Sequence, residues 1–229
     1  MKINNEVVQG NFIKRLNRFE AIVDINGEEI LVHVPNTGRC RELFLEGVPV
    51  LLERRAGKHR KTAHELIMVY KDHRLVSVDS QLPNKLADEA IRNKMMKEFQ
   101  DYDYIKREAV FGDSRFDLYL EKKDERAFVE IKGVTLEIDG VATFPDAPTE
   151  RGTKHIYELI NAKEQGYRAC VLFVVQLDFA EYFTPNSMMD PKFGEALRSA
   201  KTVGVEIYAY SCHVRADEVY LYKPMEVRL

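Results

Sequence analysis

Short predicted strands fill the first third of the chain. Between Phe19 and Ser80, apolar and polar residues alternate or form brief apolar runs, and turn residues separate these runs. Five segments show the pattern: RFEAIVDI, EEILVHV, GVPVLLERR, HELIMVYK and LVSVDS. Closely spaced short strands with little helical period are typical of a small all-β barrel or sandwich. For residues 1–80 we favour a five-stranded, partly open β barrel of the OB type, with an SH3-like barrel as the alternative.

The pattern changes after the Pro-containing connection SQLPNK. The segment LADEAIRNKMMKEF places Ala87, Ile91, Met95 and Phe99 on one helical stripe and predicts a helix of about 13 residues. The periods that follow predict the order α-β-β-β-α-β-α-β, in which YRACVLFVVQ is a buried strand. This order indicates an α/β domain with a mixed central sheet over residues 81–229.

Two of the predicted strands form a hairpin with one apolar and one charged face. Within SRFDLYL, alternation places Phe116 and Leu118 on one face and Asp117 on the other. Within FVEIKGV, Glu130 and Lys132 share a face, so that pairing of the strands would bring the three charged residues together. Two interpretations stay open. The face carries either an exposed ion pair or a carboxylate cluster that holds a divalent cation.

The composition is that of an ordinary globular protein of 229 residues, with 45% hydrophobic and 31% charged residues. No apolar run reaches the roughly 18 residues of a membrane-spanning helix, and the polar start lacks the apolar region of a signal peptide. We therefore expect a cytoplasmic protein without a membrane partner. Cys40, Cys170 and Cys212 lack the C-x-x-C spacing of zinc sites and indicate no disulfide framework.

The net charge of −3 hides an asymmetry. Residues 1–80 contain 13 Lys and Arg against 11 Asp and Glu, a net charge of +2, and the remainder carries −5. The loop HVPNTGRC offers Asn36 and Arg39 to a phosphate or base, unless they serve only as turn residues. The segment RRAGKHRK is a basic loop that either contacts phosphates or is simply solvated, and its candidate residues are Arg54, Arg55, Lys58, Arg60 and Lys61.

The segment FPDAPTERGTKHIYEL leads into a predicted helix, which Asp146 or Thr149 can cap. Arg151 and Lys154 fall in its first turns, where cations oppose the positive end of the helix dipole. A bound anion would make this arrangement favourable, so we predict that both residues contact phosphate. Arg115 is a further candidate phosphate contact, with an ordinary sheet-edge cation as the alternative.

The charged hairpin resembles the core of the PD-(D/E)xK nucleases, with Asp117 on one strand and Glu130-Ile131-Lys132 on the next. In that superfamily a glutamate of the preceding helix often joins the site. The resemblance therefore makes Glu89 a candidate metal ligand, although Glu89 lies opposite the apolar stripe of its helix.

Several longer stretches are similar to the sugar fermentation stimulation protein A (SfsA) family: VHVPNTGR, SRFDLYL, VEIKGVTL and FPDAPTERGTKHIYEL. The similarity covers essentially the whole chain. It implies an OB-like N-terminal domain, a PD-(D/E)xK-like C-terminal domain, DNA binding and a role in sugar metabolism, particularly maltose use.

The charged residues of the predicted hairpin suit the hydrolysis of phosphodiester bonds. Mg²⁺ or Mn²⁺, held by Asp117, Glu130 and the Ile131 carbonyl, would activate water and neutralise charge on the phosphate. Lys132 would orient the water or stabilise the developing negative charge. Two hypotheses follow: a metal-dependent deoxyribonuclease, and a non-catalytic DNA-binding regulator of sugar metabolism built on a nuclease-like scaffold. Both predict DNA as a mostly non-specific partner, and the sequence leaves homo-oligomer formation open.

Overall fold

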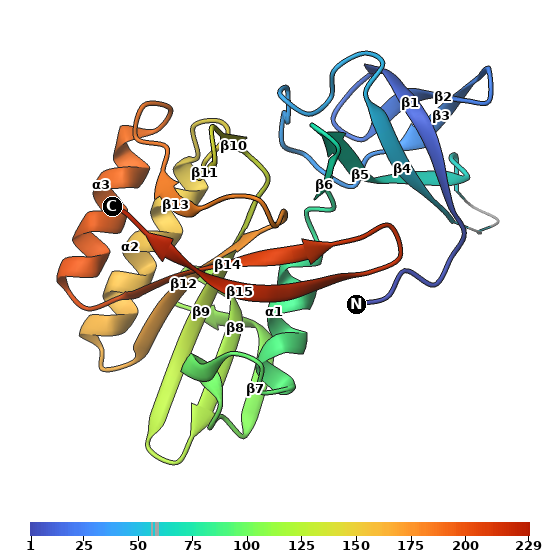
Figure 1. Ribbon diagram of the computed structural model, residues 1–229. Coiled ribbons are helices and arrows are strands. Elements are labelled where there is room, and N and C mark those ends of the chain that lie inside the picture. The colour runs from blue at the N-terminus through green and yellow to red at the C-terminus, as the bar shows by residue number, and fades with distance from the viewer. Residues whose placement is uncertain (56, 58–59) are drawn as a thin grey trace.

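The N-terminal strands close into a barrel (Figure 1). The computed structural model describes residues 1–55, 57 and 60–229. The first six strands are β1 Val7–Arg15, β2 Glu20–Ile25, β3 Glu28–His33, β4 Pro49–Arg54, β5 His64–Lys71 and β6 Arg74–Ser77. They pair in the order β3-β2-β1-β4-β5-β6, and a bridge between His33 and Glu65 joins β3 to β5. The predicted OB-like barrel of five strands, β1 to β5, is confirmed.

Strand β1 differs from the prediction, which began the barrel at Phe19. The five segments predicted from the sequence correspond to β2 through β6, and the structure adds β1 between β2 and β4. Gln9, Gly10 and Asn11 interrupt the apolar pattern of β1 and weaken its strand signal. Gly10 is needed for packing, because a Cβ at this position would lie 2.5 Å from Val23 Cγ1.

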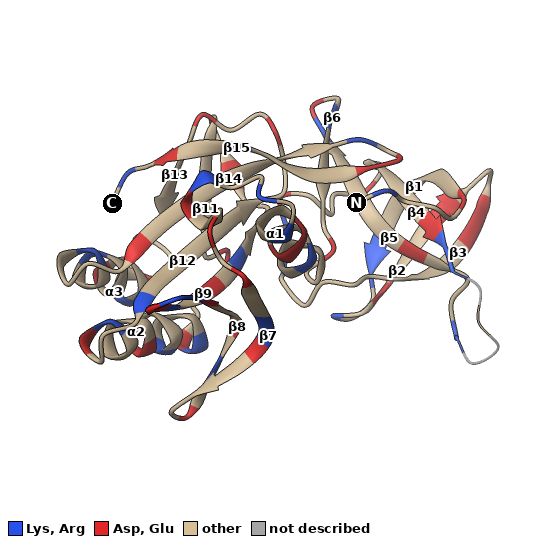
Figure 2. Ribbon diagram, turned by 90° about the horizontal axis from the view of Figure 1, so that it is seen from below, with Lys and Arg blue, Asp and Glu red and all other residues tan. Residues whose placement is uncertain are grey.

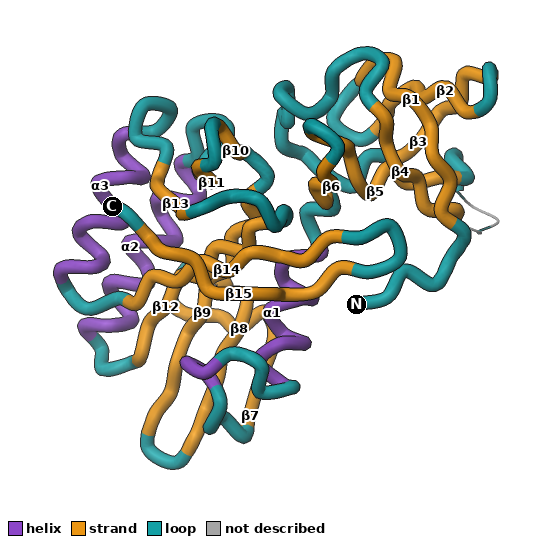
Figure 3. The backbone as a smooth tube through the Cα atoms, in the orientation of Figure 1, coloured by secondary structure: helices purple, strands orange, loops and turns teal. Residues whose placement is uncertain are grey.

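The C-terminal part is a nine-stranded mixed sheet with helices on both faces (Figures 1 and 3). Its helices are α1 Leu82–Arg92, the 3₁₀ helix η1 Lys97–Phe99, α2 Glu150–Glu164 and α3 Pro191–Thr202. Its strands are β7 Tyr104–Phe111, β8 Ser114–Lys122, β9 Glu125–Val134, β10 Glu137–Ile138, β11 Val141–Phe144, β12 Arg168–Val175, β13 Tyr182–Pro185, β14 Glu206–Val214 and β15 Val219–Val227. Their order is β10-β11-β13-β15-β14-β12-β9-β8-β7. The mixed sheet was predicted, whereas the short strands β10, β11 and β13 were not.

Helix α1 ends earlier than predicted. Its last residue is Arg92, after which Lys94 adopts a left-handed φ of 56° and the Met95 N–H donates to the Ala90 carbonyl at 2.8 Å. This is a helix-terminating arrangement. Met95, which was predicted to lie on the buried stripe, is 56% exposed. Within the described residues, none of the helices combines the length and apolar character needed to cross a membrane.

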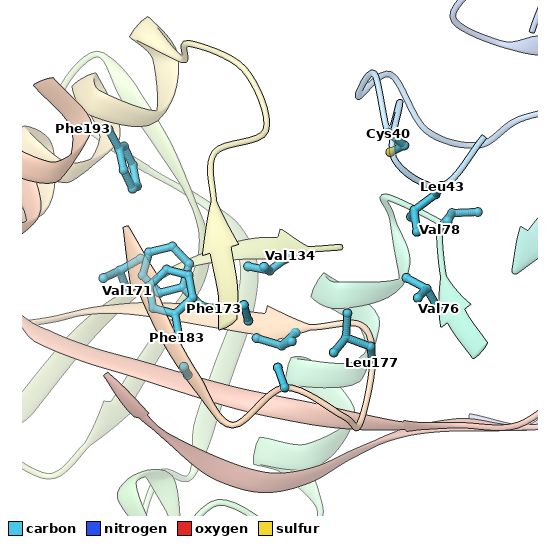
Figure 4. Packing of buried hydrophobic residues seen from close by; sticks show 14 of the residues in the cluster. Cys40, Leu43, Val76, Val78, Val134, Val171, Phe173, Leu177, Phe183 and Phe193 are labelled. Atoms are coloured by element: carbon cyan, nitrogen blue, oxygen red, sulfur yellow. The ribbon is translucent and has the colours of Figure 1, made fainter. Parts of the chain in front are cut away.

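Buried side chains form two clusters, one on each face of the large sheet. The first joins the barrel to the α2 and α3 face, and Figure 4 shows Val78 of the barrel together with Val134 and Phe173 of the sheet. The second cluster packs α1 against the opposite face. Strand β12 contributes to both, and Figure 2 shows charge only at the start of this strand. Strand β12 is therefore buried on both faces. The cysteines Cys40, Cys170 and Cys212 are buried free thiols.

Gln176, directly after β12, holds the barrel against the sheet. Its side chain is 1% exposed, and its Nε2 donates to the carbonyls of Ser77 at 2.8 Å and Asp79 at 3.2 Å. Its own backbone N–H donates to the Val134 carbonyl at 2.8 Å, and its carbonyl accepts from the Ser77 N–H at 3.0 Å. One buried residue thus connects the end of β9 to the end of β6.

We predict that Gln176→Ala lowers the free energy of unfolding by about 2–3 kcal/mol, because it leaves buried carbonyls without donors. Urea denaturation measures this change. Gln165→Ala, at the exposed C-cap of α2, is the matched control and should change stability by no more than about 0.5 kcal/mol. Equal effects of the two substitutions would contradict this role for Gln176.

Candidate metal centre on the β8–β9 hairpin

The predicted hairpin forms, and its strands separate where the charged residues lie. Strands β8 and β9 pair antiparallel from Lys122 and Glu125 to Leu118 and Val129. At the next position the Asp117 side chain replaces the backbone ladder, because its Oδ2 accepts from the Ile131 N–H at 2.7 Å. The N–H and C=O groups of a strand residue point to the same side, so the Ile131 carbonyl also faces the β8 edge.

The alternation along β8 changes at Asp117, contrary to the prediction that Phe116 and Leu118 share a face. Phe116 packs against Phe128, with ring centroids 5.2 Å apart, whereas Leu118 packs in the cluster on the α1 side. On the neighbouring strand β7, Glu108 has a left-handed φ of 53°. This local irregularity explains how Asp117 can lie at the edge between β8 and β9 instead of on a regular strand face.

Helix α1 reaches Asp117 through Asn84, which the sequence analysis missed. Asn84 Nδ2 donates to Asp117 Oδ1 at 2.6 Å. Glu89, the candidate that the resemblance indicated, lies about 140° around the helix from Asn84. Its carboxylate forms an ion pair with the Met1 amino group at 3.4 Å. The structure therefore directs Asn84 toward Asp117 and directs Glu89 toward the N-terminus of the chain.

Glu130 is a buried carboxylate, 2% exposed, with partners for only one oxygen. Its Oε1 accepts from Lys132 Nζ at 2.5 Å and from His155 Nδ1. Its Oε2 is buried and has no hydrogen-bond partner among the described residues. Arg151 Nε donates to His155 Nε2 at 3.5 Å. Because Nε2 accepts in this contact, the arrangement matches an imidazole that carries its proton on Nδ1 and donates it to Glu130.

The start of α2 explains how His155 reaches Glu130. Thr149 is the N-cap, and its Oγ1 accepts from the Gly152 N–H at 3.0 Å. The Thr149 N–H in turn donates to Asp190 Oδ2 at 2.8 Å, which ties the cap to the start of α3. With the first turn fixed in this way, His155 points into the protein and Lys154 stays exposed.

The two carboxylates have opposite pKa shifts. Burial, followed by the nearby charge of Glu130, raises the pKa of Asp117 to about 6. Burial alone would also raise the pKa of Glu130, but the hydrogen bond from His155 and the charge of Lys132 outweigh it and lower that pKa below its usual value. Glu130 is thus the permanent anion of the pair, whereas the donors Asn84 and Ile131 N–H offset only part of the burial of ionised Asp117.

These features fit a divalent cation, although the described residues contain no cluster of three or more His, Cys, Asp or Glu side chains with metal-binding geometry. Two carboxylates and a backbone carbonyl, completed by water, form a donor set that suits Mg²⁺. The buried Glu130 Oε2 without a partner is the kind of atom that a bound cation would satisfy. Asp117, Glu130 and Ile131 supply the donors, and Lys132 lies beside them.

The predicted basic loop is largely neutralised. Arg54 pairs with Glu6 at 3.0 Å, Arg55 Nε pairs with Glu65 at 2.8 Å, and Arg60 also pairs with Glu65. Lys61 is exposed, and Lys58 lies outside the described residues. These ion pairs reduce the charge that the loop can offer to phosphates.

The other predicted phosphate contacts are scattered. Asn36 is buried, where its Nδ2 donates to the Val78 carbonyl at 2.8 Å and its Oδ1 accepts from the Gly38 N–H at 2.6 Å. It therefore shapes its loop. Arg39 is exposed, and Arg115 forms an exposed pair with Glu108 at 3.3 Å. Arg151 reaches the carboxylate site indirectly, through its contact with His155.

The raised pKa of Asp117 predicts a pH-dependent stability when divalent cations are removed by EDTA. A folded-state pKa of about 6 against an ordinary value of 3.8 means that the folded protein binds this proton more tightly than the unfolded chain does. The resulting stabilisation is complete below pH 3.8 and is lost as the pH rises through 6, at a cost of at most about 3 kcal/mol. The melting temperatures of the wild type and Asp117→Asn should therefore diverge as the pH rises from 3.8 to above 6, with the variant gaining stability relative to the wild type. A difference in melting temperature that does not change with pH would contradict the raised pKa.

Comparisons with known proteins agree with this architecture. Residues 13–78 match the family model described as the SfsA N-terminal OB domain, and residues 81–218 match the sugar fermentation stimulation protein RE domain. Sugar fermentation stimulation protein homologs of Thermoanaerobacter sp. (strain X514) and Clostridium perfringens (strain 13 / Type A) are 54% and 50% identical to the chain, with full coverage of both proteins. The structure of Pyrococcus furiosus SfsA in complex with Ca²⁺ is similar, with a TM-score of 0.91, 31% identity and full coverage of both chains. The chain belongs to the SfsA family.

Proposed function

We propose that this protein is a metal-dependent nuclease that hydrolyses phosphodiester bonds of DNA at the β8–β9 hairpin. The observation that carries the proposal is the buried Glu130 carboxylate, which has Lys132 and His155 on one oxygen and no partner for the other among the described residues. Asp117, whose pKa is raised, lies beside it. A purely structural role would not require two neighbouring carboxylates in a largely buried position.

The proposed cofactor is Mg²⁺ or Mn²⁺, held by Asp117, Glu130 and the Ile131 carbonyl. The Ca²⁺ complex of the archaeal SfsA supports a divalent-cation site, because Ca²⁺ and Mg²⁺ both prefer oxygen ligands. When bound, such a cation supplies an activated water and neutralises charge on the phosphate.

The side chains around the carboxylates divide the remaining work. Lys132, held by Glu130 at 2.5 Å, brings an ammonium group to the place where negative charge develops on the phosphate oxygens. His155 fixes the orientation of Glu130 through Nδ1 and leaves Oε2 free for the cation. Asn84 and the Ile131 N–H hold the two oxygens of Asp117. We regard Asn84 and His155 as positioning residues.

The alternative is a DNA-binding regulator without catalysis, and the name of the bacterial relatives, sugar fermentation stimulation protein homologs, favours it. In such a protein the hairpin would contact phosphates directly. Two carboxylates without a cation would then repel the backbone of DNA, since like charges at close range are unfavourable. The charge distribution of the site therefore favours the nuclease.

Lys132→Met separates the two functions. It keeps the aliphatic stem and removes the charge, so cleavage should fall at least about 100-fold while cation binding remains. The assay incubates purified protein with plasmid, linear and single-stranded DNA, with Mg²⁺ or Mn²⁺ and with EDTA. Lys201→Met, on the exposed surface of α3, is the matched control and should cleave like the wild type.

A regulator would give a different result. The wild type would cleave none of the DNA forms with either cation, and Lys132→Met would only weaken DNA binding modestly at all sequences. That outcome would overturn the nuclease proposal.

A further inference from the structure

Four arginines surround an open groove on the barrel that the sequence analysis did not identify. The groove has a volume of about 630 Å³, and its lining includes Arg15, Arg18, Arg39 and Arg41. Asp146 and Ala147, from the segment that leads into α2, also line the groove. The groove therefore lies between the barrel and the C-terminal domain.

Arg15 gives the groove a defined shape. Its guanidinium donates to the carbonyls of Gly38 at 2.6 Å and Arg18 at 2.8 Å, and it lies 5.0 Å from the centroid of the Phe44 ring. These contacts tie the β1–β2 turn to the loop that follows β3. Arg15 is thus structural, and the exposed cations of the groove are Arg18, Arg39 and Arg41.

These three cations differ from those of the β4–β5 loop. The arginines of that loop pair with carboxylates, whereas no Asp or Glu in the described part of the chain lies within 4.0 Å of the guanidinium nitrogens of Arg18, Arg39 or Arg41. Asp146 lies in the groove, but its Oδ2 accepts from the Arg39 backbone N–H at 3.1 Å. Four arginines against one aspartate leave the groove with an excess of positive charge, which suits a polyanion.

The groove lies close to the carboxylate site. Ala147 is four residues before Arg151, a chain length of at most about 14 Å, and one further helical turn of about 6 Å leads to His155, which contacts Glu130. At the 3.4 Å rise of B-DNA, about 20 Å corresponds to about six nucleotides of one strand, and an extended single strand covers it with fewer. A single bound strand is therefore long enough to reach both places.

Apolar side chains beside the arginines indicate which form of DNA fits. Leu16 and Phe19 are each 50% exposed on either side of Arg18, and Phe19 stacks on His33 with an interplanar angle of 10°. Phe19 lines a neighbouring hollow together with Arg60 and Lys61, and half of its side chain stays exposed there for stacking. Unpaired bases stack on such rings, whereas a duplex keeps its bases inside. Building on the proposed nuclease function, we infer that this arginine groove binds a single-stranded DNA segment whose continuation enters the Glu130 site.

The test measures binding of a fluorescent single strand of about 12 nucleotides, and of the same sequence as a duplex, by anisotropy in EDTA. The groove variant carries Arg18→Ala, Arg39→Ala and Arg41→Ala. The matched control carries Lys163→Ala, Arg198→Ala and Lys201→Ala, which remove the same charge from the last two turns of α2 and α3. We expect the wild type to prefer the single strand. The groove variant should bind the single strand at least about tenfold more weakly. Its plot of log affinity against log salt concentration should be less steep by about 2, at roughly 0.7 per lost phosphate contact. The control should bind within about twofold of the wild type.

Phe19→Ala tests the stacking contact separately and should weaken single-strand binding without affecting the duplex. Circular dichroism checks that each variant is folded, and Arg18→Ala alone replaces the triple variant if that one unfolds. The inference is overturned if the control at the ends of α2 and α3 loses affinity and the groove variant does not, or if the wild type prefers the duplex. In both cases cation-dependent cleavage by the wild type would leave the nuclease proposal intact. If the wild type binds neither form, the DNA target and the inference fail together.

Discussion

A buried carboxylate needs compensation for its charge, and Glu130 receives it from one side only. Lys132 and His155 both contact Oε1, which keeps the residue ionised inside the sheet, while Oε2 faces no donor among the described residues. Asp117 adds a second carboxylate in surroundings that raise its pKa. Removing one partner of a buried ion pair costs several kcal/mol, because the remaining charge is left without compensation. The buried charge of Glu130 therefore depends on Lys132 and His155, and a bound cation would add compensation at Oε2.

The remaining architecture brings these groups together. The separation of β8 from β9 lets Asp117 contact the Ile131 N–H, α1 contributes Asn84, and α2 contributes His155. Gly133 lets the end of β9 approach the start of α1 and Gln176, because a Cβ there would lie 2.7 Å from Pro83 Cγ and 2.8 Å from Gln176 Oε1. The same joint that fixes the barrel therefore also fixes the strand that carries Glu130 and Lys132.

Part of this could be predicted from the sequence. The hairpin and its charged residues Asp117, Glu130 and Lys132 could be predicted, because strand pairing across a short connection is a local property. The change of alternation at Asp117 could not be predicted. The sequence did not identify His155 and Asn84 as partners of the carboxylates, since the rotation of a helix about its axis depends on tertiary packing. The helical stripe placed Glu89 toward solvent, and its contact with Met1 agrees with that placement. Strand β1 was missed because its pairing with β2 and β4 outweighs the weak strand propensity of Gln9, Gly10 and Asn11.

The central claim is that one divalent cation completes the Glu130 carboxylate. The most direct measurement is the anomalous difference density of crystals grown or soaked with Mn²⁺. The account predicts one strong peak between the carboxylates of Asp117 and Glu130, with Glu130 Oε2 and the Ile131 carbonyl among the ligands at roughly 2.0–2.3 Å. No peak at this place at saturating Mn²⁺, or a peak bound elsewhere while Glu130 Oε2 keeps no partner, would contradict it.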